Sequence, residues 1–251
     1  MGNSIVNEAR NRFDAELHTE EYKKIHSDDA HLQSLLQLFE IRDAGKYFDL
    51  GTGNGYVAFE AAKQYPKCSF TGIDIANESI AKNNTIAEET GMKNIRFISY
   101  DGIELPFMNE FFDGGVSRYA MHHFPDINKS IAELNRVLKI NGFFILSDPK
   151  TYDEDINGFI DSYQKMNPDG HVHFYREGEI DASFANKGFV KEKSFISHVT
   201  YPRIYDENYQ SLLASEHAEL LEKYKIRIED NLIYITVECM NSFYRKISNI
   251  G

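Results

Sequence analysis

Cysteine is scarce in this chain, and so is positive charge. The two cysteines, Cys68 and Cys239, stand far apart and form no C-x-x-C motif. This argues against a zinc knuckle and is typical of a protein in a reducing cytosol. Lysine and arginine number 27 against 39 aspartates and glutamates, for a formal net charge of −12. Because nucleic-acid affinity rests largely on cationic contacts, this balance disfavours a nucleic acid as partner, although a local basic patch would survive an acidic average.

Long apolar runs are missing as well. None approaches the ~20 residues that a membrane-spanning helix needs. No targeting segment is evident, so the cytoplasm is the expected location. Internal repeats and low-complexity linkers are also absent from the sequence. With 251 residues and 42% hydrophobic content, the chain can form one globular domain with a full core and a small appendage.

A strand–loop–helix pattern begins near residue 46. Apolar residues run into three glycines at two-residue spacing, Gly51, Gly53 and Gly55, and an alanine-rich helical pattern follows. Such glycines let the chain turn tightly and bring bare backbone against a ligand. The unsatisfied N–H groups of the following helix point to the same place. The pattern predicts a small-molecule site, with a tight turn that holds no ligand as the alternative.

The spacing of this loop argues against a dinucleotide. A dinucleotide-binding loop reads G-x-G-x-x-G, but the sixth position counted from Gly51 is the bulky Tyr56. An acid, Asp49, stands before the loop instead. That position suits a ligand with an ammonium group and a cationic sulfonium better than one with a pyrophosphate.

Strand and helix patterns alternate between residues 46 and 148. The expected strands are 46–50, 69–74, 95–100, 112–117 and 142–147, and the expected helices are 54–65, 78–90 and 127–138. The alternation predicts an α/β fold with a parallel sheet and helices on both faces. Ligands bind such sheets at the carboxyl ends of the strands.

Acids stand at two further strand ends. Asp74 follows Gly55 by 19 residues, about the spacing at which an acid accepts both hydroxyls of a ribose. Asp101 can accept from the exocyclic amine of adenine, with Ile75 and Ile103 on either side of the ring. Each acid also has an explanation that involves no ligand. Asp74 would stabilise the start of the next helix, and Asp101 would be a turn residue.

Two longer segments complete a family pattern, SRYAMHHFPD at 117–126 and ELNRVLKINGFFILSDP at 133–149. In this order, after 49–55, Asp74 and Asp101, they resemble the class I S-adenosylmethionine (SAM) dependent methyltransferases. They look most like small bacterial methyltransferases related to the quinone-biosynthesis C-methyltransferases. The resemblance implies SAM as cofactor. It also implies a Rossmann-like, seven-stranded, mostly parallel sheet with helices on both faces and an antiparallel C-terminal hairpin. The implied cofactor-binding residues are Asp49, Gly51, Thr52, Gly53, Gly55, Asp74, Ile75, Asp101, Gly102 and Arg118.

The resemblance implies a single methyltransferase domain over residues 1–251. It divides into an N-terminal helical lid at 1–40, a SAM-binding core at 41–150, and a substrate-side insert with closing strands at 151–251. Residues 1–18 are polar and expected to be loosely held. A helix is expected near Thr19 and another after Ser27, its N-cap. Tyr22 and His26 fit either a lid over the ligand or a solvated helix face. Further helices are expected at 153–166, as a wall of the acceptor pocket, at 176–187 and near 207–223, and strands at 189–200 and 231–240.

The candidate catalytic residues are His122, His123 and Asp148. We expect His122, rather than His123, to face the acceptor and take a proton, because it lies nearer the strand end. Asp148 is the candidate to orient its ring. A packing role for either histidine is the alternative. His171 and His173 form an H-x-H pair without a nearby cysteine or acid cluster at ligand spacing, so no metal is expected.

The chemistry favoured by the sequence is O- or C-methylation of a small molecule. A base is required when the acceptor is a neutral oxygen, a carbon acid or a protonated nitrogen. The chain has no Pro-Pro-Tyr motif of amino-methyltransferases and no cysteine in the expected site strands. One alternative is a SAM-binding sensor or pseudoenzyme without transfer. Another is an RNA methyltransferase, which the charge disfavours. Neither the acceptor nor the oligomeric state follows from the sequence.

Overall fold

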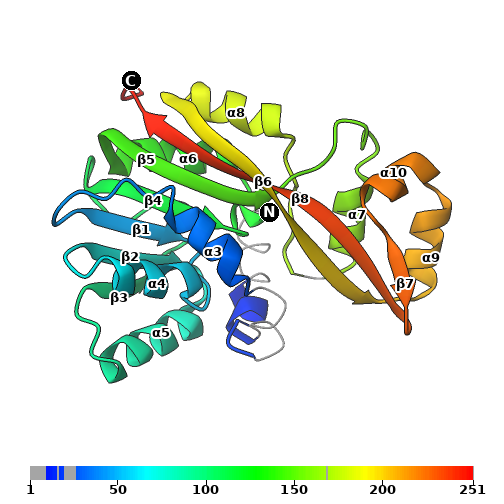
Figure 1. Ribbon diagram of the computed structural model, residues 1–251, viewed down its shortest axis with the longest axis horizontal. Coiled ribbons are helices and arrows are strands. Elements are labelled where there is room, and N and C mark those ends of the chain that lie inside the picture. Colours follow the sequence, from blue (N-terminus) through cyan, green and yellow to red (C-terminus); the bar gives the residue numbers. More distant parts are fainter. Residues whose placement is uncertain (1–9, 16, 20–26, 168, 251) are drawn as a thin grey trace.

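A mixed β-sheet runs through the computed structural model, with helices on both of its faces (Figure 1). The structure describes residues 10–15, 17–19, 27–167 and 169–250. The strand order is β3-β2-β1-β4-β5-β8-β6, and a short β7 pairs with β8 off this path. The first five strands are parallel, whereas β8 runs antiparallel to both β5 and β6. The predicted fold class is therefore confirmed, with β7 as an addition.

The bounds of the elements follow in chain order. The strands are β1 (Lys46–Leu50), β2 (Ser69–Asp74), β3 (Ile95–Ser99), β4 (Phe112–Arg118), β5 (Leu138–Pro149), β6 (Phe189–Ile204), β7 (Arg227–Glu229) and β8 (Leu232–Lys246). The helices are α3 (Asp29–Leu36), α4 (Tyr56–Gln64), α5 (Asn77–Glu89), the 3₁₀ turn η1 (Met121–His123), α6 (Ile127–Val137), α7 (Phe159–Lys165), α8 (Glu177–Ala185), α9 (Glu207–Ala214) and α10 (Ala218–Lys223).

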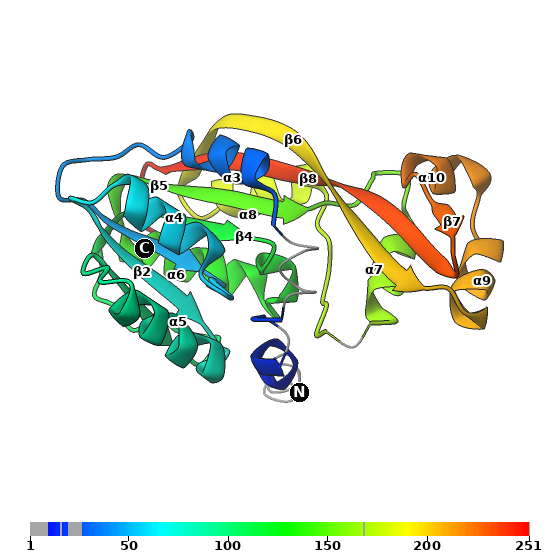
Figure 2. The same ribbon diagram turned by 60° about the horizontal axis from the view of Figure 1, so that its bottom comes forward.

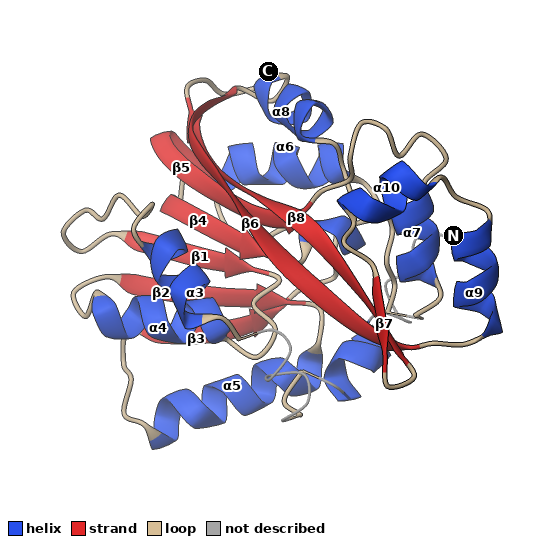
Figure 3. Ribbon diagram, turned by 45° about the vertical axis from the view of Figure 1, so that its right-hand side comes forward, coloured by secondary structure: helices blue, strands red, loops and turns tan. Residues whose placement is uncertain are grey.

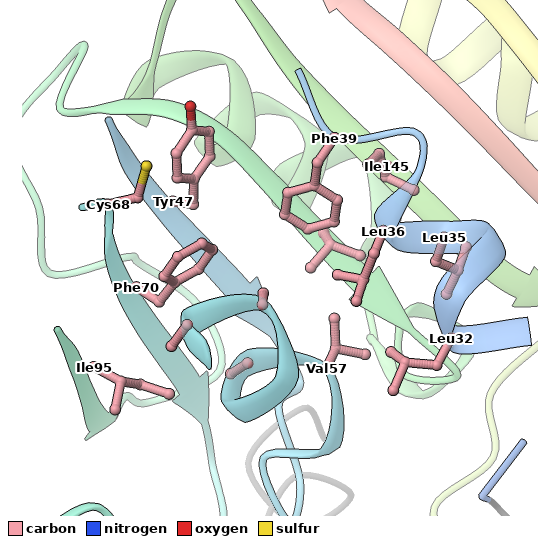
Figure 4. Close-up of a cluster of buried hydrophobic side chains, with 14 of the residues drawn as sticks. Leu32, Leu35, Leu36, Phe39, Tyr47, Val57, Cys68, Phe70, Ile95 and Ile145 are labelled. Atoms are coloured by element: carbon pink, nitrogen blue, oxygen red, sulfur yellow. The ribbon is translucent and has the colours of Figure 1, made fainter. Parts of the chain in front are cut away.

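Two apolar layers sandwich the sheet. On one face, α3, α4 and α5 bury aliphatic side chains against the aromatic residues of β1 and β2, and Figure 4 shows Leu36 and Val57 among them. On the other face, α6 and α8 contribute residues such as Leu134 and Phe184. The central strands are buried on both faces, as parallel strands usually are. The sheet is thus held rigidly, which fixes the positions of its strand ends.

The last two long strands depart from the expected short hairpin. The pairing of β6 with β8 begins where Phe189 lies opposite Lys246 and continues to where Ile204 lies opposite Leu232, well past the other strands. Their far halves carry α7, α9, α10 and β7 as a small outer lobe with its own buried cluster (Figures 2 and 3). The expected helix near 207–223 is two helices, α9 and α10.

Two predicted helix starts are wrong. α7 begins at Phe159 rather than 153, because Gly158 adopts a left-handed backbone (φ 71°) and the Asp155 carboxylate accepts from the backbone N–H of Phe159 at 2.6 Å. The N-cap of α3 is Asp28 rather than Ser27, since the Asp28 side chain accepts from the His31 N–H at 3.0 Å. The candidate lid residues 22 and 26 lie outside the part of the chain that the structure describes.

Candidate functional site

The glycine loop after β1 is tied to the end of β2. The backbone N–H groups of Gly51 and Thr52 both donate to the carbonyl of Ile73, at 2.8 and 3.1 Å. Gly51 has φ 71°, and a Cβ added there would lie 2.3 Å from the Cβ of Ala120. Gly55, also left-handed at φ 80°, occupies the N-cap of α4. At Gly51 a side chain is excluded both by the backbone conformation and by the closeness of Ala120 in the next loop.

Two of the strand-end acids are buried beside this loop. Asp49 is 4% exposed and accepts from the Thr52 hydroxyl at 2.8 Å. Asp74 accepts from the backbone N–H of Gly53 at 2.8 Å and of Ala76 at 3.0 Å. Each oxygen of a carboxylate has two acceptor sites, so Asp74 keeps capacity for a ligand hydroxyl. Within the described ranges, Asp49 forms no ion pair.

The third acid has a different setting. Asp101 is exposed, and its Oδ1 accepts from the backbone N–H groups of Ile103 and Glu104, at 2.8 and 3.0 Å. Ile103 is 53% exposed. The neighbours of Asp101, Tyr100 and Gly102, line the cavity, whereas neither Asp101 nor Ile103 is among the described lining residues. Asp101 therefore shapes the turn that brings Tyr100 and Gly102 to the site.

A cavity of about 1010 Å³, counted with its open mouth, lies at these strand ends. Of the predicted cofactor residues, Gly55 and Asp101 are outside its described lining, and the rest line it: Asp49, Gly51, Thr52, Gly53, Asp74, Ile75, Gly102 and Arg118. The lining also includes apolar and aromatic residues that the sequence analysis did not assign to the site, namely Phe13, Leu17, Tyr56, Tyr100, Tyr119, Phe124 and Pro125. Polar groups of the glycine loop and ring-bearing side chains thus line the same cavity.

The described part of the N-terminal segment is packed onto this cavity, contrary to the expected loose tail. Leu17 is 4% exposed and lies against Gly53. Phe13 meets His123 edge-on with ring centroids 5.1 Å apart. The Asp14 carboxylate accepts from the N–H of Glu78, at the start of α5, at 2.8 Å. The local polarity of this segment predicts a loosely held tail. The packing partners of Phe13 and Leu17 lie in distant parts of the chain and come together with them only in the folded molecule.

Arg118 occupies the end of β4 beside the loop. Its guanidinium lies over the rings of Tyr119 and Tyr56, 4.1 and 5.1 Å from their centroids. Its Nε lies 3.3 Å from Nδ1 of His31, a buried residue that sequence patterns did not reveal. The other ring nitrogen of His31 lies 2.8 Å from the Asn241 side-chain oxygen. Arg118 is thus held against aromatic faces at the cavity wall.

The histidine that lines the cavity is not the one that the sequence analysis expected to face it. His123 lines the cavity, while His122 is not among the described lining residues. His122 is instead buried, with Nδ1 2.8 Å from Oδ1 of Asp148. The predicted contact between His122 and Asp148 is present, but it lies behind His123, whose ring centroid is 4.1 Å from that of His122. Successive residues of a 3₁₀ turn point about a third of a circle apart, so only one of the pair can face the cavity.

Burial and neighbouring imidazoles control the charge of His123. Burial, followed by the proximity of His122, lowers the pKa of His123 well below its usual range. Its Nδ1 is enclosed without a hydrogen-bond partner among the described residues. Burial also raises the pKa of Asp148 well above its usual range. Near neutral pH, His123 is therefore an uncharged imidazole at the cavity wall.

The H-x-H pair is bridged by a carboxylate. Asp161 of α7 lies 2.7 Å from Nε2 of His171 and also contacts Nδ1 of His173. The backbone N–H groups of Val172 and His173 donate to the carbonyl of His122, at 3.0 and 3.1 Å. Across the described ranges, no group of three or more His, Cys, Asp or Glu side chains could hold a metal ion. The pair fastens the loop behind the cleft histidines to α7.

Known proteins with similar sequences and structures share this arrangement of strands. A family model described as a methyltransferase domain matches residues 41–214. The uncharacterized methyltransferase YcgJ of Bacillus subtilis is 29% identical over 182 residues, which cover 72% of this chain and 70% of that protein. Its crystal structure matches with a TM-score of 0.74 and 24% identity, covering 88% of this chain and all of the other.

Two further matches are more distant. Demethylmenaquinone methyltransferase of Thermus thermophilus is 31% identical over 101 residues, which cover 40% of this chain and 46% of that protein, less than half of its length. The structure of geranyl diphosphate methyltransferase in complex with SAM matches with a TM-score of 0.67 and 14% identity, covering 94% and 95% of the two chains. Such low identity shows the fold alone. The family match spans more than half of the sequence, so this chain belongs to the methyltransferase domain family and is a SAM-dependent methyltransferase.

Proposed function

We propose that this chain methylates a small-molecule acceptor on oxygen or on carbon. The observation that carries the proposal is His123, whose imidazole lines the same cavity as the glycine loop. A neutral imidazole can take a proton from a hydroxyl or an activated carbon. An acceptor that needs no deprotonation would not require His123 as a base.

The residues around the loop fit the cofactor. Gly51 leaves backbone exposed where a Cβ has no room, and Asp49 is a buried carboxylate with no ion pair to any residue that the structure describes. We assign Asp49 to the cationic end of SAM, Arg118 to its carboxylate and Asp74 to its ribose hydroxyls. Ile75 and Gly102 are assigned to the adenine side, with Asp101 acting through its turn. When bound, SAM supplies an electrophilic methyl group on a good leaving group.

The remaining residues position the acceptor and hold a proton. Phe13, Tyr119 and Phe124 form the ring-bearing part of the cavity, which suits an apolar acceptor and excludes water. His123 takes the proton that the acceptor loses, and His122 with Asp148 supports its ring from behind. The relative named demethylmenaquinone methyltransferase acts, by its name, on a small molecule. No described helix is long and apolar enough to cross a membrane, and the net charge of −12 disfavours RNA as acceptor.

Incubation of the protein with methyl-labelled SAM and the host's small-molecule extract tests the proposal. We expect a labelled small molecule whose new methyl group is on oxygen or carbon. Parallel calorimetric titrations should show binding of SAM and of S-adenosylhomocysteine, and none of NAD. SAM binding without transfer to any species would favour the non-catalytic sensor, and label in RNA would favour the RNA methyltransferase.

We also expect SAM affinity to rise with pH up to about 7. Burial raises the pKa of Asp49 to about 7 in the free protein, and a cation binds the ionised form. Below that pH each unit should weaken SAM binding by up to about tenfold, because one proton must leave on binding. The stability of the free protein depends on pH in the opposite direction. Native Asp49 holds its proton more tightly than the unfolded chain, so its contribution to the unfolding free energy falls as the pH rises from 3.8 to about 7.

Titration calorimetry at several pH values in buffers of different ionisation enthalpy measures both the affinity and the released proton. The matched control is Asp49→Asn, which cannot ionise and should bind SAM weakly with little pH dependence. A parent protein whose SAM affinity stays constant across this range would remove Asp49 from the cation site.

A further inference from the structure

Arg203 is partly buried in the outer lobe, and its Nε is enclosed. On β6 it follows Val199 and Tyr201 at two-residue spacing, the face on which both are buried. Its guanidinium lies 5.5 Å from the ring centroid of Tyr201. Its Nη2 donates to Oε1 of Gln164 on α7 at 3.3 Å, and its Nη1 donates to the carbonyl of Pro202 at 2.9 Å. The cation is thus enclosed between β6 and α7.

The hydrogen-bonding capacity of this region is not used up. Three buried atoms have no partner among the described residues: Nε of Arg203, Nε2 of Gln164 and the hydroxyl of Tyr163. Gln164 is 3% exposed and Tyr163 is fully buried. No ion pair joins Arg203 to a carboxylate in the described ranges, although acids outnumber bases 39 to 27 in the chain. We call Arg203, Gln164 and Tyr163 the donor cluster.

All three unused groups are donors. The amide nitrogen and the guanidinium Nε–H can only donate. Burial raises the pKa of the Tyr163 hydroxyl above its usual range, so this group keeps its proton and can donate as well. Leaving several donors buried and unsatisfied destabilises a fold unless a ligand or water completes them. Donors beside a guanidinium that forms no ion pair within the described ranges match an oxyanion in charge.

The donor cluster is linked to the cavity wall through α7, although none of its three residues belongs to the described lining. Gln164 is one helical turn beyond Asp161, whose carboxylate holds His171, and the His171 ring centroid is 6.3 Å from that of His123. Tyr201 connects the same two regions. Tyr119, which lines the cavity, and Arg203 both lie close enough to Tyr201 to influence the pKa of its hydroxyl.

We propose that Arg203, Gln164 and Tyr163 bind an oxyanion, a carboxylate or a phosphate, carried by the methyl acceptor at some distance from the atom that is methylated. The inference rests on the proposed function for the identity of the ligand. A carboxylate or phosphate places two or more acceptor atoms against a guanidinium fork, and the amide and hydroxyl complete its coordination. The rival explanation is a cluster filled by water that serves packing alone.

Binding of inorganic phosphate and of acetate separates these explanations. Calorimetry on the parent, Arg203→Gln, Tyr163→Phe and the control Arg227→Gln, an exposed arginine of the same lobe, should show binding of at least one probe to the parent and the control. Both cluster variants should bind it about tenfold or more weakly, the usual loss for a hydrogen bond to a charged group. Preference for phosphate or for acetate tells which oxyanion the acceptor carries.

Tyr163→Phe makes the test independent of folding. Its hydroxyl has no partner, so its removal should leave the melting temperature in probe-free buffer unchanged or raised while probe binding falls. Parent-like probe binding in both cluster variants, or no binding of either probe to the parent, would overturn the oxyanion site. The labelled-SAM assay separates this from the proposed function. A labelled small molecule without a carboxylate or phosphate contradicts only the oxyanion site, whereas no labelled small molecule contradicts the proposed function.

Discussion

Replacing His123 by alanine is expected to lower single-turnover methyl transfer by about 10²–10⁴-fold, the usual weight of general acid–base catalysis. The reason is that His123 lines the cavity as an imidazole kept neutral by burial. SAM affinity should change little, because in our assignment the cofactor is held by Asp49, Asp74 and Arg118. Rapid-quench measurement of one turnover with saturating labelled SAM, with SAM affinity measured in parallel, gives both quantities.

The matched control is His198→Ala, which removes an exposed histidine of β6 that is not among the described residues lining the cavity. It should transfer methyl groups at the parent rate. His122→Ala is the informative second variant, because His122 contacts Asp148 behind His123. We expect it to be slower than the parent and faster than His123→Ala. A parent-like rate for His123→Ala together with a large loss in His122→Ala would return the role of base to His122.

Gly51→Ala is expected to reduce SAM-dependent transfer by about 10²-fold, the cost of displacing reacting groups by roughly 1 Å. Two constraints act at this position. Its φ of 71° is unfavourable for a residue with a side chain, and the new Cβ would lie 2.3 Å from the Cβ of Ala120. The loop must therefore move away from Ala120, which shifts Thr52 and Gly53 on the cavity wall. Calorimetry should show weaker SAM binding in the same variant.

Gly91→Ala separates loop displacement from backbone strain. Gly91 has nearly the same φ, 68°, but nothing lies within 4 Å of an added Cβ, and it is remote from the cavity lining. Both variants should lose about 1–2 kcal/mol of unfolding free energy through the strained backbone. Only Gly51→Ala should also lose SAM affinity. Equal SAM binding by the two variants, at temperatures where both are folded, would show that the loop around Gly51 does not touch the cofactor.

Much of the core follows from local sequence. β1 and β2 have the predicted bounds, and α4, α5 and α6 differ from prediction by one or two residues at their ends. The spacing of apolar residues and the positions of glycines are local properties. In parallel strands buried on both faces, these properties largely set where each strand begins and ends. The strand ends follow from the same pattern, so most of the predicted cofactor residues line one cavity.

What local sequence left open was decided by contacts between distant segments. His122 and His123 are chemically identical neighbours, and burial of His122 against Asp148, 26 residues away, turned His123 to the cavity. Leu17 and Phe13 read as part of a polar tail until Gly53 and His123 provide their packing partners.

The parallel strands, the glycine loop and the acids at the strand ends could be predicted because each depends on residues close together in the chain. The side chains that complete the cavity and the build of the outer lobe depend instead on contacts between distant segments. The far halves of β6 and β8 stabilise one another through pairing across a long connection, and the donor cluster joins Gln164 to Arg203 over 39 positions. Such contacts produce no periodic pattern in the sequence of either segment, because they stabilise the fold only when the two segments have come together.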